Sequence, residues 1–277
     1  MSGGPGDRID TVFLDVNGTL VPSVPRSGAA DPRTSVAFRE GVRALRSAGV
    51  RVGLCSDSPL EQLWEFGRAI GLGTPPDFPV IAENGNVAAD GTVRVMTPFS
   101  RRTAIAERMA ELARQSGLRR VADVLAPEFG GSAPAAREWG FGANRRASLS
   151  LFGPADFIES AIRHLTEWAL RDRWELSVDI SPARTFAGLH PYSPTRLGKR
   201  RAFAELAAAG ERNMLMVGDS AADWIPDVPG VRSAFVAHSD VPAEAATGAW
   251  HFSDRPVLAG VIDILGKVTE LQLAQQR

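Results

Sequence analysis

The sequence predicts an α/β protein with a parallel sheet in its core and a smaller α+β domain inserted into that core. Two observations support this prediction. Strand and helix patterns alternate over residues 11–85, and the same alternation resumes after Pro191. A chain of 277 residues, 44% of them hydrophobic, is long enough to bury one large core together with a second, smaller one.

The first segment contains three apolar strands separated by two amphipathic helices. TVFLDV and VRVGLC are nearly continuous apolar runs, which is typical of parallel strands that are buried on both faces. PVIAENGN is a third strand, and it leaves the sheet through an Asn-Gly turn. The strands are predicted at residues 11–16, 50–55 and 79–86, and the helices at residues 35–49 and 58–73.

The middle of the chain, residues 86–189, is predicted to form the inserted α+β domain. Residues 103–117 and 155–170 keep apolar side chains at helical spacing, whereas residues 147–153 and 175–180 alternate like half-buried strands. We expect two helices and one open-faced antiparallel sheet in this domain.

The last segment returns to the core pattern. GKRRAFAELAAAG predicts a short helix, NMLMVGD a strand with an acidic end, SAFVAHSD another strand, and RPVLAGVIDILGKV a closing helix. Residues 1–85 and 190–277 are therefore predicted to form one core domain.

Composition excludes several classes of protein. The net charge of −1 provides no general attraction to nucleic acid or to an anionic membrane surface. No run approaches the roughly 20 apolar residues that span a bilayer, and the first residues lack the apolar centre of a signal peptide. The single cysteine, Cys55, permits no internal disulfide and is expected to be a buried strand residue. We expect a cytoplasmic monomer or homodimer that binds neither nucleic acid nor membrane.

Polar residues follow several of the predicted core strands, at the edge where parallel sheets bind their ligands. Lys199 stands out among them, because only two of the 31 basic residues are lysines. We expect these polar residues to converge on one site. They are Asp15, Asn17, Thr19, Ser56, Lys199, Asp219 and Asp223.

Asp219 and Asp223 are four residues apart, at the end of an apolar strand and the start of the next predicted helix. This spacing puts both carboxylates on one helical face, which suits a hard cation such as Mg²⁺. A simpler interpretation is that Asp219 caps the helix and that Asp223 is a solvated acid in its first turn. Asp15 faces the same edge, and three converging carboxylates would repel one another without a cation, so the metal site is preferred.

Four stretches resemble, in their order and spacing, the motifs of the haloacid dehalogenase-like (HAD) phosphatase superfamily: FLDVNGTL, LCSDS, GKRRAFAEL and VGDSAAD. PVIAENGN, and an insert of about a hundred residues between the second and third motifs, resemble the Cof-type members. Phosphatases for sucrose phosphate, trehalose phosphate and mannosylphosphoglycerate share this layout. The resemblance implies a Rossmann-like, parallel-sheet HAD core and an α+β cap formed by residues 86–189.

The resemblance also implies a role for each matching acidic residue. Asp15 would be the nucleophile, forming an aspartyl phosphate that water then hydrolyses. The other oxygen of Asp15, the backbone carbonyl of Asn17 and the Asp219 carboxylate would hold Mg²⁺. Asp223 would bind the ion directly or through water.

Two further matching residues would act on the transferred phosphoryl group. Ser56 would donate a hydrogen bond to it, while Lys199 would neutralise its charge and hold Asp15 ionised. Thr19, which would support the nucleophile loop, and Asp57, which shares a turn with Ser56, complete the substrate-binding set predicted in the core.

The cap would select the substrate, and the resemblance favours a sugar or polyol phosphate. Arg145, Arg146, His190 and Trp139 are the candidate contacts for such a ligand. An ordinary surface or packing role is an equally good interpretation of each.

Asn17 departs from the family pattern, because most of these phosphatases have aspartate there. An amide cannot protonate the leaving oxygen or take a proton from the attacking water. Four explanations compete. Asn17 could be an engineered Asp→Asn substitution that traps substrate, or it could be natural in an enzyme whose leaving group needs little protonation or whose acid lies elsewhere. The protein could instead bind a phosphorylated ligand without turnover, or deamidation of the Asn-Gly sequence could supply some Asp at this position.

The sequence therefore predicts a Mg²⁺-dependent phosphomonoesterase that acts on a small phosphorylated metabolite. The alternatives are an impaired HAD-like protein that only binds such a ligand, and a phosphotransferase or mutase.

Overall fold

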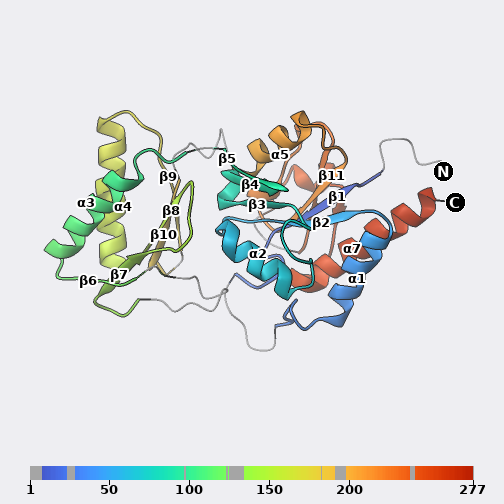
Figure 1. Ribbon diagram of the computed structural model, residues 1–277, viewed down its shortest axis with the longest axis horizontal. Helices are drawn as coiled ribbons and strands as arrows, with labels where there is room; N and C mark the ends of the chain where they lie inside the picture. Colours follow the sequence, from blue (N-terminus) through green and yellow to red (C-terminus); the bar gives the residue numbers. More distant parts are fainter. Residues whose placement is uncertain are drawn as a thin grey trace. The chain divides into compact units, whose positions relative to one another are not determined.

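The computed structural model describes residues 8–23, 29–96, 98–122, 124, 134–181, 183–190, 198–237 and 241–276. These residues form two compact units (Figure 1). The larger unit contains the described residues up to Ser58, residues 63–94 and the described residues from Gly198 onward. The smaller unit contains residues 59–62 and the described residues between Val95 and Leu197.

The larger unit is built on one sheet, to which the described residues contribute eight strands in the order β13-β12-β11-β1-β2-β3-β4-β5. Neighbouring strands from β13 to β3 are parallel, and β4 joins β3 in the antiparallel sense. The strands are β1 (Thr11–Leu14), β2 (Arg51–Cys55), β3 (Val80–Ala82), β4 (Val87–Asp90), β5 (Thr92–Val95), β11 (Met214–Gly218), β12 (Val231–Phe235) and β13 (His251–Phe252).

The strand order reverses at β1, which lies between β2 and β11. Leu14, the last residue of β1, is paired with Leu54 on one side and with Val217 on the other. From β1 the chain adds β2 and β3 on one side, and it later adds β11, β12 and β13 on the other. Open α/β sheets bind ligands beyond the carboxyl ends of the strands at such a switch point.

Amphipathic helices pack on this sheet because their apolar residues recur at helical spacing. Ser35 accepts a hydrogen bond from the Phe38 amide and caps the first helix. That helix lies beside the last one (Figure 1). Phe203 meets Phe13 of β1 edge to face, with ring centroids 5.1 Å apart. The helices are α1 (Val36–Ser47), α2 (Leu60–Ala69), α5 (Lys199–Ala208), α6 (Ala245–Gly248) and α7 (Val257–Gln275).

Both predicted domain boundaries differ from those in the structure. The larger unit extends to Arg94, past the predicted end at residue 85, because β4 and β5 continue its sheet. It resumes at Gly198 rather than at residue 190, because His190 is the last residue of a strand in the smaller sheet. The Asn-Gly sequence lies in the turn of the β3–β4 hairpin, and the insert begins only after this hairpin.

The smaller unit combines two helices with a sheet to which the described residues contribute five strands, in the order β6-β7-β8-β10-β9. The pairs β7–β8, β8–β10 and β10–β9 are antiparallel, whereas β6 and β7 are parallel, so the sheet is mixed and not purely antiparallel as expected. The elements are α3 (Arg102–Gln115), β6 (Arg119–Arg120), β7 (Glu138–Phe141), β8 (Leu149–Phe152), α4 (Ala155–Arg171), β9 (Ser177–Ile180) and β10 (Phe186–His190).

The helices α3 and α4 lie together beside this sheet (Figure 1). Alternate strand residues, such as Leu149, Leu151 and Leu189, join the helices in one apolar cluster. Ser150 and His190 belong to the intervening positions, which point to the opposite face. The polar positions of β8 and β10 therefore share the face away from the helices.

None of the helices in the described parts of the chain combines the length and the hydropathy needed to traverse a lipid bilayer.

Candidate active site

Two aspartates mark the switch point of the larger sheet. Asp15 directly follows β1, and Asp219 directly follows β11. The amide of Asp15 donates to the carbonyl of Val217, at 2.9 Å, and so continues the pairing of the two strands up to the aspartates. The structure thus brings together two predicted metal ligands that are 204 residues apart in sequence.

The loop after Asp15 folds back over the strand ends. The Leu20 amide donates to the Val16 carbonyl at 2.9 Å and closes a tight turn. Inside this turn Thr19 is fully buried. Its hydroxyl lies 3.2 Å from Oδ1 of Asp219 and 3.4 Å from Oδ2 of Asp15, so its single proton can bond to either carboxylate.

Gly18 allows the loop to approach Asp219 closely. Its φ is +82°, in the left-handed region, and a Cβ there would lie 2.1 Å from Oδ2 of Asp219. Its amide donates to the Val21 carbonyl at 2.7 Å, and Asn17 forms an isolated bridge with Val21. A residue with a side chain at position 18 would displace the Asp219 carboxylate, so glycine is required at this point of the turn.

Lys199, the first residue of α5, reaches the same carboxylates. Its Nζ donates to Oδ1 of Asp15 at 2.7 Å and to Oδ1 of Asp223 at 2.6 Å, and the residue is only 6% exposed. Burial lowers the pKa of Lys199, but the two carboxylates outweigh this effect and raise it well above its usual value. Lys199 is therefore a fixed ammonium ion.

Asp223 is held by hydrogen bonds on both oxygens. Its Oδ2 accepts from the amides of Asp219 and Ser220 and from the Ser220 hydroxyl, while Oδ1 accepts from Lys199. The bond from the Ser220 amide is one half of a capping box on the 3₁₀ turn Ala221–Asp223, in which the Ser220 side chain accepts from the Asp223 amide in return. The two aspartates are thus neighbours through a strand end and a 3₁₀ turn, and not on one face of an α-helix as the sequence predicts.

The three aspartates form a buried cluster in which one oxygen from each lies within 4.8 Å of the others. The pKa of Asp15 is raised to about 8, chiefly because the carboxyl group is buried; Lys199 opposes this rise, and the charges of Asp223 and Asp219 add to it. One ammonium ion does not balance three carboxylates. Hard carboxylate oxygens at this spacing fit Mg²⁺. Since Asp223 already accepts four hydrogen bonds, Asp15 and Asp219 would be the better direct ligands.

Ser56 follows β2, the neighbour of β1, and is almost fully buried. Its amide donates to the Ile81 carbonyl at 2.9 Å, which fixes the loop to the end of β3. Its hydroxyl lies 3.3 Å from Oδ1 of Asp57 and 3.4 Å from the Ser58 hydroxyl. The predicted phosphate donor therefore stands at the strand end next to that of the predicted nucleophile.

Cys55 is buried, as predicted. Burial in the strand raises the pKa of its thiol, which stays protonated and makes a poor nucleophile.

In the smaller unit the structure brings two of the predicted substrate contacts together. Nε2 of His190 lies 3.0 Å from Oδ2 of Asp179, and Nη1 of Arg145 donates to the Ser148 hydroxyl at 3.1 Å. The hydrogen bond from His190 holds the pKa of Asp179 below its usual value, and the charge of Arg145 contributes to this. Asp179 was not predicted from the sequence, although the strand alternation in SVDI places it opposite the core-facing Val178.

Two other candidates of the smaller unit have different surroundings. Trp139 is 2% exposed and packs against Phe141 and Phe157 in the apolar cluster, so it is a core residue and not a ligand contact. Arg146 donates to Oε1 of Glu61 through Nε at 3.2 Å.

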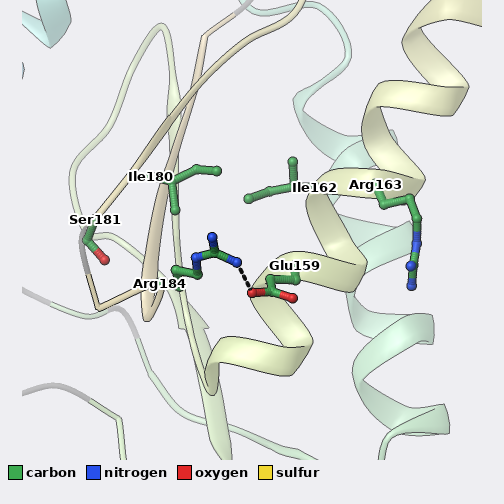
Figure 2. A pocket seen from close by; sticks show the side chains of 6 residues that line it. All are labelled: Glu159, Ile162, Arg163, Ile180, Ser181 and Arg184. Carbon is green, nitrogen blue, oxygen red and sulfur yellow. Dashed lines mark hydrogen bonds and ion pairs between the residues drawn. The ribbon is translucent and has the colours of Figure 1, made fainter.

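A pocket of about 620 Å³ opens beside α4 in the smaller unit. Figure 2 shows Arg184 pointing toward Glu159, with which it forms an ion pair, while the side chain of Arg163 points away from both. None of the predicted site residues lines this pocket. Its lining residues are Glu159, Ile162, Arg163, Ile180, Ser181 and Arg184.

No protein-family model matches the chain, and no curated protein matches it in sequence. Solved structures do match over nearly the whole chain. A haloacid dehalogenase-like hydrolase from Bacteroides thetaiotaomicron aligns with a TM-score of 0.65 at 14% identity, covering 94% of this chain and 100% of that one.

Two further solved structures are similar. A protein from the same bacterium, described among the phosphatases of the haloalkanoate enzyme superfamily, aligns with a TM-score of 0.61 at 14% identity and covers 97% and 98% of the two chains. Trehalose-6-phosphate phosphatase from Aspergillus fumigatus aligns with a TM-score of 0.51 at 17% identity over 96% and 93%. At such low identity these similarities establish a shared fold: the chain has the α/β fold of HAD-like hydrolases.

Proposed function

We propose that this protein is a Mg²⁺-dependent phosphomonoesterase of the HAD superfamily that acts on a small phosphorylated metabolite. The observation that carries the proposal is the buried ammonium ion of Lys199, which bridges Asp15 and Asp223 at the switch point of the sheet. A transferred phosphoryl group is negatively charged and must be neutralised by nearby positive charge. Lys199 supplies one such charge, and the carboxylates around it can hold a metal ion that supplies more.

In the proposed reaction Asp15 is the nucleophile. A carboxylate oxygen of Asp15 forms a bond to phosphorus, and the bond between phosphorus and the leaving oxygen breaks. The leaving oxygen keeps the electron pair of that bond and takes a proton from water. Water then attacks the phosphorus of the aspartyl phosphate, releases inorganic phosphate and restores the Asp15 carboxylate. Mg²⁺, when bound, supplies positive charge that offsets the repulsion between the phosphate and the carboxylates.

The other residues hold and neutralise the reacting groups. Lys199 favours the ionised form of Asp15 by opposing the effect of burial on its pKa, and it faces the charge that develops on the transferred oxygens. Asp223 fixes Lys199 from its other side, and the Thr19 hydroxyl can donate its proton to either Asp15 or Asp219. Ser56 offers a hydroxyl from the neighbouring strand end.

The proposed substrate is a sugar or polyol phosphate. Trehalose-6-phosphate phosphatase, with its similar fold, acts on a sugar phosphate. In the smaller unit the Asp179–His190 pair offers hydrogen bonds suited to hydroxyl groups, and Arg145 adds positive charge. A cytoplasmic location and a monomeric or homodimeric state stay predictions.

Asn17 favours a second candidate function. Its amide has no acidic proton for the leaving group, and general acid–base catalysis typically contributes about 10²–10⁴-fold to the rate. The second candidate is a protein that keeps the metal and phosphate sites but turns over little of its ligand.

The proposal is tested by measuring phosphate release from a panel of sugar and polyol phosphates. The unchanged chain is compared with Asn17→Asp, and Asp15→Asn is introduced into both. We expect Asp15→Asn to abolish release in either background, and Asn17→Asp to release phosphate faster by about 10²-fold or more. Mass spectrometry must first show that Asn17 is not deamidated.

Asp263→Asn is the matched control. It makes the same chemical change in the same unit, at a carboxylate that pairs with His251, and should keep full activity. Unchanged release by Asp15→Asn would rule out Asp15 as the nucleophile. Ligand binding without release, in both the unchanged chain and the Asn17→Asp variant, would favour the second candidate.

A further inference from the structure

The turn Glu83–Gly85 has an unusual backbone. Its three consecutive residues have positive φ, at +50° for Glu83, +56° for Asn84 and +89° for Gly85. Glu83 is fully buried. Left-handed conformations cost energy in residues other than glycine, and they persist where surrounding contacts hold them in place.

On one side this turn is fixed to the loop that carries Ser56. The amide of Asn84 donates to the Ser56 carbonyl at 3.1 Å, and the amide of Glu83 donates to the Ser58 carbonyl at 3.0 Å. The carbonyl of Glu83 in turn accepts the Asn86 side-chain amide at 2.7 Å. These bonds define where the turn lies relative to the predicted phosphate donor.

On its other side the turn contacts the start of α5. A Cβ on Gly85 would lie 2.2 Å from the Gly198 carbonyl oxygen and 2.8 Å from the Lys199 nitrogen. Gly198 itself has φ +97° and ψ −160°, a conformation that is essentially restricted to glycine, and its carbonyl accepts the Arg201 amide at 3.1 Å. Two glycines thus permit a backbone contact at the first turn of the helix.

We propose that Gly85 is a positioning residue, which sets the place of Lys199 by direct backbone contact with Gly198. The turn would then hold the Lys199 ammonium at a fixed distance from the Ser56 hydroxyl, so that both donors fit one phosphoryl group. This inference rests on the proposed function, because it assigns Lys199 to the phosphate.

The test compares Gly85→Ala with Gly91→Ala. Gly91 has φ +75°, and no atom lies within 4 Å of the position that a Cβ would take, so its substitution brings left-handed strain without the clash. The affinity for inorganic phosphate is measured at saturating Mg²⁺, which does not require turnover. We expect Gly85→Ala to weaken phosphate binding roughly tenfold and Gly91→Ala to leave it unchanged, because a small displacement of a charged donor is costly.

Two further measurements separate positioning from a general structural defect. The Mg²⁺ affinity of Gly85→Ala should not fall, because a Lys199 ammonium displaced from Asp15 leaves that carboxylate more negative toward the ion. In a Lys199→Met background, Gly85→Ala should no longer affect phosphate binding. An equal loss with and without the lysine would overturn the inference.

Gly198→Ala provides a second route if Gly85→Ala does not fold. A Cβ there would lie no closer than 3.7 Å to any atom, but alanine does not adopt φ +97° and ψ −160°, so the Gly198 backbone would have to move away from Gly85. This variant should give the same loss of phosphate affinity with Mg²⁺ affinity kept. If Gly85→Ala and Gly198→Ala bind phosphate as tightly as Gly91→Ala does, the inference about Gly85 is overturned, while the proposed function is unaffected. Absence of phosphate binding by the unchanged chain would overturn the proposed function as well.

Discussion

At the scale of single residues, Lys199 shows why a lysine occurs in a chain whose basic residues are, with one other exception, arginines. Its ammonium is a compact charge that reaches Asp15 and Asp223 at 2.7 and 2.6 Å from one nitrogen atom. A planar guanidinium spreads its charge over a wider fork and would displace one of these carboxylates. The residue type follows from the space between two buried acids.

Replacing this lysine should destabilise the larger unit. Lys199→Met leaves Asp15 and Asp223 buried without their counter-ion, a loss of about 3–5 kcal/mol in the free energy of unfolding. The other lysine of the chain is the control: Lys267 pairs with Glu270 on the surface, so Lys267→Met should change stability by about 0.5 kcal/mol or less.

Urea unfolding with and without Mg²⁺ measures both effects. The loss in Lys199→Met should shrink when Mg²⁺ is added, because the metal offsets the same carboxylates. Equal stability of the two variants without Mg²⁺ would contradict the assignment of Lys199 as a buried counter-ion.

At the scale of elements, the loop after β1 and the 3₁₀ turn after β11 act as a matched pair. Gly18 lets the loop approach Asp219. Gly218, the last residue of β11, leaves room for the 3₁₀ turn, since a Cβ there would lie 2.1 Å from Cγ of Asp223. The carboxylates are close because glycine leaves room beside each of them. Backbone shape, and not helical spacing, places the acidic residues.

Gly18→Ala tests this packing. Its Cβ would collide with Asp219, so we expect at least about 2 kcal/mol more destabilisation than in Gly49→Ala, together with weaker Mg²⁺ binding. Gly49 is a close control, since it has φ +80° and no atom within 4 Å of the Cβ position. Chemical denaturation and calorimetric titration with Mg²⁺ measure the two quantities, and equal effects of both substitutions would refute the argument.

At the scale of the whole molecule, the sheet order brings distant segments to one edge. β1 and β11 are neighbours although most of the chain lies between them. A cation held by residues after both strands would therefore join the two ends of the sequence and favour the folded state over the unfolded one.

Mg²⁺ should consequently stabilise the full chain. At a free concentration 100 times its dissociation constant, a ligand specific for the folded state adds about 2.7 kcal/mol. Asp219→Asn should lose most of this gain, whereas Asp263→Asn should keep it. Thermal unfolding over a series of Mg²⁺ concentrations gives the dependence, and an unaltered midpoint for the original chain would argue against a metal site.

Much of this architecture follows from local patterns. The apolar runs predict β1, β2, β3 and β11 because a strand buried on both faces must be apolar throughout. The convergence of Asp15 and Asp219 could be predicted since strand ends in a parallel sheet meet at one edge. The parallel pairing of β6 and the continuation of the core sheet into β4 and β5 could not, because pairing partners are not encoded in a strand's own alternation.

The sequence by itself determined the fold class and the residues that supply charge at the strand ends, since both depend on residue type and spacing along the chain. Only the tertiary structure decided how those charges pair. It placed Lys199 between Asp15 and Asp223, saturated Asp223 with donors, joined His190 to Asp179 and set Gly85 against Gly198. These are contacts between segments far apart in sequence, and their distances exist only after the sheet order has been fixed.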